Sequence, residues 1–202
     1  GGLTRITQTY LDGQLQSITG TAGVAEYHSY TVNSGSAAYE AGSITETVHY
    51  GTSDGAHWRK VTTNFLGQVL REEEPSPAGA GAVIVTTHAY NAKGQRIKTS
   101  RTGVADLIVE YDDWGRVAKQ GYDVSGDNAL TVNSNDVLST SSTEYVQAQG
   151  TVLERVVRTQ YTQDGSAAGA LQTTTERKLL EGSQWQRVTQ ADGSVLTQWD
   201  EM

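Results

Sequence analysis

The chain has 202 residues, a formal net charge of −8 and no cysteine. This charge argues against nucleic acid as a partner, because no basic stripe is present to neutralise phosphates, and the lack of cysteine excludes a disulfide framework. Hydrophobic residues make up 36% of the chain, with one Phe and one Met against 10 Tyr and 4 Trp. We therefore expect thin layers of Val, Leu, Tyr and Trp under a polar sheet instead of a compact core.

The first third of the chain has the pattern of β-hairpins. Short apolar runs in residues 3–32 flank a turn at Asp12-Gly13, and residues 27–32 form a further run that ends at the turn-forming stretch 33–36. Thr, Ser, Val and Tyr are abundant and no stretch has a sustained period near 3.6 residues, which favours strands over helices. No run of about 18 apolar residues exists, so we expect no membrane insertion.

A longer repeat begins near residue 43. Residues 44–65, 142–161 and 174–189 each contain a polar strand with Thr-Glu, a glycine turn, and a strand with a basic residue before Val. Trp58 and Trp185 occupy equivalent positions in the first and third copies, and we expect both to stack between adjacent strands.

A shorter aromatic-turn-glycine unit recurs along the chain. Its copies pair Tyr10 with Gly13, Phe65 with Gly67, Tyr90 with Gly94, and Tyr111 with Gly115. In the last copy Asp112 can accept turn hydrogen bonds, Gly115 can take the left-handed conformation, and Arg116 starts the return strand. Tyr122-Asp123 then begins a further unit.

Three stretches interrupt the hairpin pattern. Residues 72–82, 123–142 and 164–170 are polar or rich in Gly, Pro and Ala, and we expect loops there. None is a convincing linker, so residues 1–202 are expected to form one continuous array. The chain begins Gly1-Gly2 without Met, which indicates a fragment of a larger protein.

The stretch Tyr111-Asp112-x-x-Gly115-Arg116-Val117, followed by Tyr122-Asp123, resembles the YD repeat of the Rhs family. That family includes Rhs toxins, shell proteins of insecticidal toxin complexes, and teneurins. The resemblance is strongest over 83–123, and Gln68 and Gln95 stand where the family usually has Arg. It implies an all-β fold, a long curved sheet of antiparallel hairpins that winds into a hollow shell around a polypeptide cargo. It also implies a secreted or cell-surface protein, as in the bacterial toxins of the family.

Other sites can be imagined in the sequence. The four histidines lack helical spacing and no Cys accompanies them, which favours scattered residues over a metal site. Asp123 to Asn128 offers oxygen ligands for calcium, but the spacing of an EF-hand is absent and a polar turn explains the stretch. Asp112 and Asp113 are neighbours in a tight turn, so their side chains should point apart and perform no acid–base chemistry.

The sequence therefore favours a non-catalytic structural segment without a cofactor, whose partners are a protein cargo or neighbouring repeats of the same chain. The alternative is an extracellular adhesin that binds glycan by stacking on Trp114, which we expect to be exposed in its turn. The two free sheet edges should either pair in an edge-to-edge homodimer or be capped by loops such as 72–82.

Overall fold

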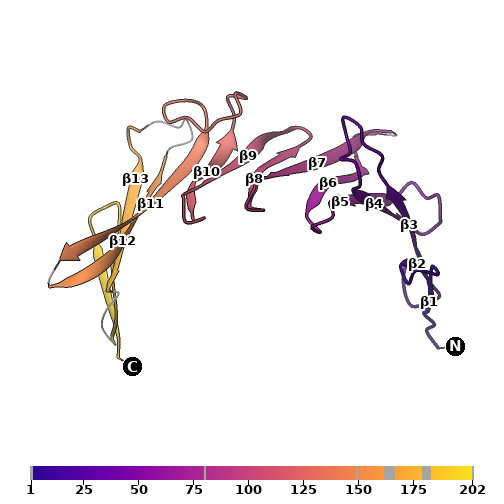
Figure 1. Ribbon diagram of the computed structural model, residues 1–202, viewed down its shortest axis with the longest axis horizontal. Coiled ribbons are helices and arrows are strands. Elements are labelled where there is room, and N and C mark those ends of the chain that lie inside the picture. The colour runs from indigo at the N-terminus through magenta and orange to yellow at the C-terminus, as the bar shows by residue number, and fades with distance from the viewer. Residues whose placement is uncertain (1, 80, 149, 162–166, 179–182, 202) are drawn as a thin grey trace. The chain divides into compact units, whose positions relative to one another are not determined.

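The protein is described by a computed structural model that covers residues 2–79, 81–148, 150–161, 167–178 and 183–201, with the backbone alone for 183–185 and 199–201. This described part contains fifteen strands and no helix. Within each of the two compact units described next, each strand pairs antiparallel with its neighbours in sequence, so the strand order follows the order of the chain (Figure 1). The expected all-β fold of repeated antiparallel hairpins is confirmed.

Contacts divide the chain into two compact units, Gly1–Val104 and Ala105–Met202. The first unit holds eight strands: β1 (Ile6–Thr9), β2 (Leu15–Thr19), β3 (Glu26–Val32), β4 (Ile44–Tyr50), β5 (Trp58–Thr63), β6 (Val69–Pro75), β7 (Val83–Tyr90) and β8 (Arg96–Arg101). The second unit is built from β9 (Val104–Tyr111), β10 (Val117–Asp123), β11 (Val137–Ala148), β12 (Thr151–Gln160), β13 (Leu171–Lys178), β14 (Ser183–Thr189) and β15 (Val195–Glu201).

Few large apolar side chains are buried. Among the described residues the buried hydrophobic ones are Ile108, Leu130, Leu138 and Leu153, all in the second unit, whereas nine polar or charged residues are buried. Most strand residues are half-buried on both faces of the sheet. A compact core is therefore lacking among the described residues, but the buried apolar side chains are Ile and Leu, not the layers that also include Val, Tyr and Trp expected from composition. Cross-strand pairs are the main stabilising contacts of such a sheet.

The small apolar core of the second unit depends on the loop between β10 and β11. Residues 124–136 carry Leu130 onto Ile108 and Leu138. Gly121 lies opposite both Ile108 and Leu138 in the strand ladder. A Cβ there would lie 2.2 Å from the carbonyl oxygen of Val137, so only glycine permits this close approach of β11.

The first expected loop is partly strand. Residues 72–75 belong to β6, whereas residues 76–82 form the connection to β7. The prediction was wrong for 72–75, where each glutamate is paired with an arginine of the sheet: Glu72 with Arg59 on β5, Glu73 with Arg71 on the same strand and Glu74 with Arg101 on β8. The connection joins two interior strands, so it caps neither outer edge of the sheet, and the expected capping by this loop is wrong. The alternative, edge-to-edge pairing between copies, stays a prediction.

The second expected loop, 123–142, is shorter in the structure than predicted, and the third is only partly described. The connection after β10 ends at Asp136, since β11 begins at Val137. Part of the expected loop 164–170 lies outside the described residues, which resume at Ala167 with a turn. No helix in the described part is long and apolar enough to cross a membrane.

Candidate functional site

Five turns of the sheet share one backbone geometry, and we call them the bulge turns. In each, the first residue donates its N–H to the carbonyl of the fifth, and a glycine at the fourth position donates to the carbonyl of the first. These glycines have φ between 76° and 86°, the left-handed conformation of a three-residue hairpin loop with a bulge. The five turns are Tyr10–Gln14, Asn64–Gln68, Asn91–Gln95, Asp112–Arg116 and Gln190–Ser194.

The first and fifth side chains of three bulge turns form matched pairs. Asp112 accepts from the backbone N–H of Trp114 and Arg116 through one carboxylate oxygen, and from Arg116 Nε at 2.7 Å through the other. Asn64 uses its oxygen in the same way and donates its amide to Gln68 at 2.8 Å; the Asn91 turn repeats this at 2.9 Å. Glutamine at the fifth position thus accompanies asparagine at the first, as arginine accompanies aspartate in the Asp112 turn.

This geometry corrects the sequence alignment of the repeat. Tyr90 and Tyr111 precede the first turn position, but Tyr10 occupies that position and Phe65 occupies the second. Phe65 is 85% exposed and contributes nothing to the turn frame. Tyr90 donates its hydroxyl to the carbonyl of Val69 at 2.9 Å, and Tyr10 donates to the carbonyl of His28. The glycine positions were predicted correctly, whereas a shared role for the four aromatic residues was not.

Trp114 occupies the third position of its turn and is 75% exposed, as expected. The Arg116 guanidinium lies 4.7 Å from the centre of its ring, a cation–π contact. The hydrogen bond to Asp112 raises the pKa of Arg116, with a smaller contribution from Tyr145 on β11. At 75% exposure most of the indole surface is open to a ligand.

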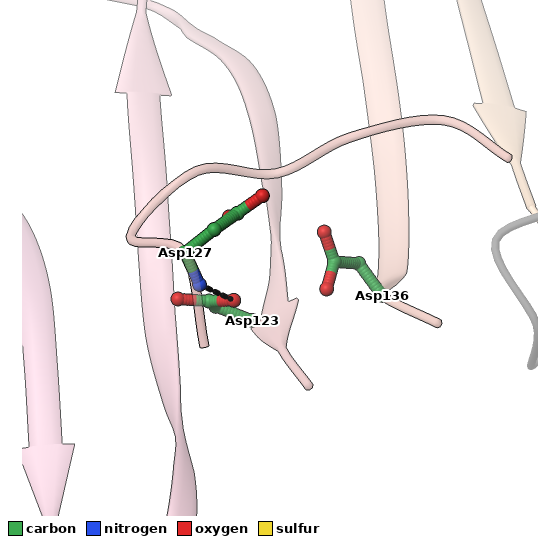
Figure 2. Close-up of side chains that lie close together, drawn as sticks. All are labelled: Asp123, Asp127 and Asp136. Atoms are coloured by element: carbon green, nitrogen blue, oxygen red, sulfur yellow. Dashed lines mark hydrogen bonds between the residues drawn. The ribbon is translucent and has the colours of Figure 1, made fainter. Parts of the chain in front are cut away.

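The loop after β10 gathers three carboxylates, shown in Figure 2. One oxygen from each of Asp123, Asp127 and Asp136 lies within 4.8 Å of the others. Asp123 accepts from the backbone N–H of Gly126 and Asp127 through one oxygen and of Asn128 through the other. Asp123 thus fixes its turn by accepting from backbone N–H groups, as Asp112 does. The preceding residue, Tyr122, is 45% exposed.

Asp136 is fully buried and holds the same loop from its other end. One of its oxygens accepts from the N–H groups of Val124 and Ser125, and the other accepts from Thr131 at 2.9 Å. Burial opposes ionisation, but these amide donors outweigh it and hold the pKa of Asp136 below its usual range. Both oxygens of Asp123 and of Asp136 accept hydrogen bonds from backbone N–H groups of the loop, which fits the polar-turn interpretation of Asp123 to Asn128.

A ladder of alternating charges crosses four strands of the second unit, and we call it the charge ladder. Glu144, Arg155, Glu176 and Arg187 are directly opposed in successive strands β11 to β14. Arg155 donates to Glu144 at 3.0 Å and to Glu176 at 2.9 Å, and Arg187 donates through Nε to Glu176 at 2.7 Å. These two arginines hold the pKa of Glu176 below its usual range although burial opposes them.

The charge ladder tests the longer repeat. Copies 142–161 and 174–189 are structurally equivalent, because each places its Glu opposite its Arg. In copy 44–65 Glu46 faces Val61 instead, so the correspondence fails there. Trp58 is half-buried with Lys60 Nζ 5.0 Å from its ring centre, while the side chain of Trp185 lies outside the described part of the structure.

The four histidines do not converge. His49 contacts the carbonyl of Gly55 at 3.1 Å and His88 contacts the hydroxyl of Thr99 at 3.1 Å, while His57 is exposed in a turn. His28 has a carboxylate within hydrogen-bonding distance of one ring nitrogen, Glu46 at 2.9 Å.

Comparison of the sequence with protein-family models and with curated proteins finds no match.

Proposed function

We propose that the chain is a non-catalytic structural segment of a larger β-shell or scaffold of a secreted or cell-surface protein, related to the YD-repeat shells and enclosing a polypeptide cargo. The observation that carries this proposal is the single-layer sheet with polar buried positions. Among the described residues the apolar core is confined to a few side chains of the second unit, and each strand relies on its sequence neighbours for pairing. It grows by adding hairpins, as repeat proteins do.

The bulge turns support this interpretation. Their first, fourth and fifth positions are used to fix backbone geometry, and Gln68 Nε2 also donates to the carbonyl of Gly94 in the neighbouring bulge turn at 3.1 Å. This bond between two neighbouring turns holds the two hairpins in register at that point. None of these side chains is arranged as a nucleophile with a base.

Limited proteolysis of the complete polypeptide tests the enclosure. A segment of that polypeptide outside residues 1–202 should resist protease while the shell is folded and be cut rapidly after denaturation. Equal digestion of every segment before and after denaturation would contradict the proposal. In the isolated chain, β1 and β15 leave two sheet edges, which we expect to pair between copies; light scattering that gives a monomer at all concentrations would contradict this.

A glycan-binding adhesin is the second candidate, favoured by the 75% exposure of Trp114 beside Arg116. A hollow of about 980 Å³ also lies on β9 to β13, lined by hydroxyl, amide and aromatic side chains that include Gln120, Tyr122 and Ser139. A glycan array should then give signals that Trp114→Ala removes and that Phe65→Ala, an equally exposed turn aromatic, leaves intact. An array without signals would count against this candidate.

A further inference from the structure

His28 has a buried ring nitrogen without a partner. Its side chain is 9% exposed, and Nε2 is the one buried side-chain N or O atom lacking a hydrogen bond among the residues that the structure describes. Nearly all buried polar atoms in proteins are hydrogen-bonded, so an orphan of this kind needs a physical explanation.

The other ring nitrogen fixes the state of the imidazole. Nδ1 lies 2.9 Å from a carboxylate oxygen of Glu46, and that carboxylate also accepts from the Tyr30 hydroxyl at 3.0 Å. An ionised carboxylate can only accept, so Nδ1 carries the proton. In this contact the Tyr30 hydroxyl is the donor and the carboxylate is the acceptor. In the neutral ring the lone pair is consequently at Nε2.

That lone pair faces a second carboxylate. A Glu26 oxygen lies 3.6 Å from His28 Nε2, too far for a hydrogen bond. A lone pair and a carboxylate repel one another unless a cation lies between them. Two donor atoms on a tetrahedral zinc ion, with bonds of about 2.0–2.1 Å, are about 3.4 Å apart, close to the separation observed here.

We propose that His28 Nε2 and Glu26 bind a divalent metal ion of the zinc class, with Glu46 as the carboxylate that orients the histidine. Carboxylate–histidine–metal triads of this form fix the ring tautomer and raise the basicity of the ligating nitrogen. Two protein ligands leave two tetrahedral positions for water or for a donor from a partner. Tyr10 covers the site, since its hydroxyl bonds to the His28 carbonyl and its ring packs edge-on against Tyr30 at 6.3 Å.

His88 supplies a matched control in the same unit. Its Nε2 also lies 3.6 Å from a carboxylate, that of Glu72. However, Glu72 is paired with Arg59, and Nδ1 of His88 meets a hydroxyl instead of a carboxylate. His88 and Glu72 have the same separation as His28 and Glu26, but Glu72 is held by Arg59 and no carboxylate orients His88. We therefore expect this pair not to bind metal.

The test is calorimetric titration of the whole chain with Zn²⁺ at about pH 7.5, where free histidine is neutral. One binding event should appear, be lost in His28→Gln, weaken at least tenfold in Glu26→Gln, and weaken about 10–100-fold in Glu46→Gln. His88→Gln should bind as the wild type does. In the wild type, Zn²⁺ should shift the NMR signal of His28 Nε2, a readout that requires no variant to fold.

Two results would overturn the proposal. The first is a wild-type chain that binds no Zn²⁺ and whose His28 NMR signal responds to pH but not to Zn²⁺. A proton on Nε2, not a metal ion, would then lie between His28 and Glu26. The second is binding that survives His28→Gln and disappears in Asp127→Asn, which would place the metal at the acidic loop after β10.

Discussion

Glu176 should contribute strongly to the stability of the second unit. Its side chain is 4% exposed and accepts from Arg155 and Arg187, which are 34% and 37% exposed. Hydrogen bonds to charged groups contribute about 1.5–3 kcal/mol each, but solvent screening at the exposed arginines reduces this. We expect Glu176→Gln, which keeps the side-chain shape, to lower the free energy of unfolding by about 2 kcal/mol.

The loss should depend on pH in a defined direction. The two arginines lower the pKa of Glu176 in the folded state, so its contribution is complete above the unfolded value, about 4.3 for glutamate. It disappears as the pH falls through the folded pKa. The difference in the free energy of unfolding between wild type and Glu176→Gln should therefore be largest at neutral pH and should disappear in strong acid.

Urea unfolding measures both effects. With a slope of about 2 kcal/mol per molar urea, the Gln variant should unfold at a midpoint about 1 M lower at neutral pH. Glu144→Gln is the control, because Glu144 is 54% exposed and pairs only with Arg155, so its midpoint should move much less. Equal midpoints for wild type and Glu176→Gln, or a gap that persists in strong acid, would refute the reasoning.

Two further predictions concern the backbone. Gly121→Ala should destabilise the fold by about 1–3 kcal/mol, since its Cβ would lie 2.2 Å from the Val137 carbonyl oxygen; Gly23→Ala, with nothing within 4 Å, is the control, and equal thermal midpoints for the two would contradict the packing argument. Asp112→Asn and Arg116→Gln should each lower the melting temperature, whereas the double variant recreates the Asn–Gln pair of the other bulge turns and should recover most of the loss. Additive losses in the double variant would show that the two side chains do not act as a pair.

Local features were predictable from the sequence because their determinants lie within five residues. The turn at Asp112 follows from an Asx side chain, a glycine three positions later and a cation at the fifth position, all read directly from the chain. The exposure of Trp114 followed from its place in that turn. Anchoring the repeat on aromatic residues instead of on the Asx–Gly frame misaligned Tyr10 and Phe65, although the frame itself was present in the sequence.

Non-local pairing could not be predicted in the same way. The run Glu72-Glu73-Glu74 reads as a solvated loop, yet Glu72 and Glu74 are paired with arginines 13 and 27 positions away. Asp136 likewise bonds to backbone groups at residues 124, 125 and 131, which no local motif indicates. The contact that occupies Nδ1 of His28, and so leaves Nε2 without a proton, comes from Glu46 on the neighbouring strand.

Cryo-electron microscopy of the complete polypeptide would test the central proposal most directly. The account predicts that the outer edges of β1 and β15 are hydrogen-bonded to further hairpins of the same chain, and that density for a separate polypeptide segment lies against one face of the sheet. A complete polypeptide in which both edges end in solvent and no segment is enclosed would contradict the account.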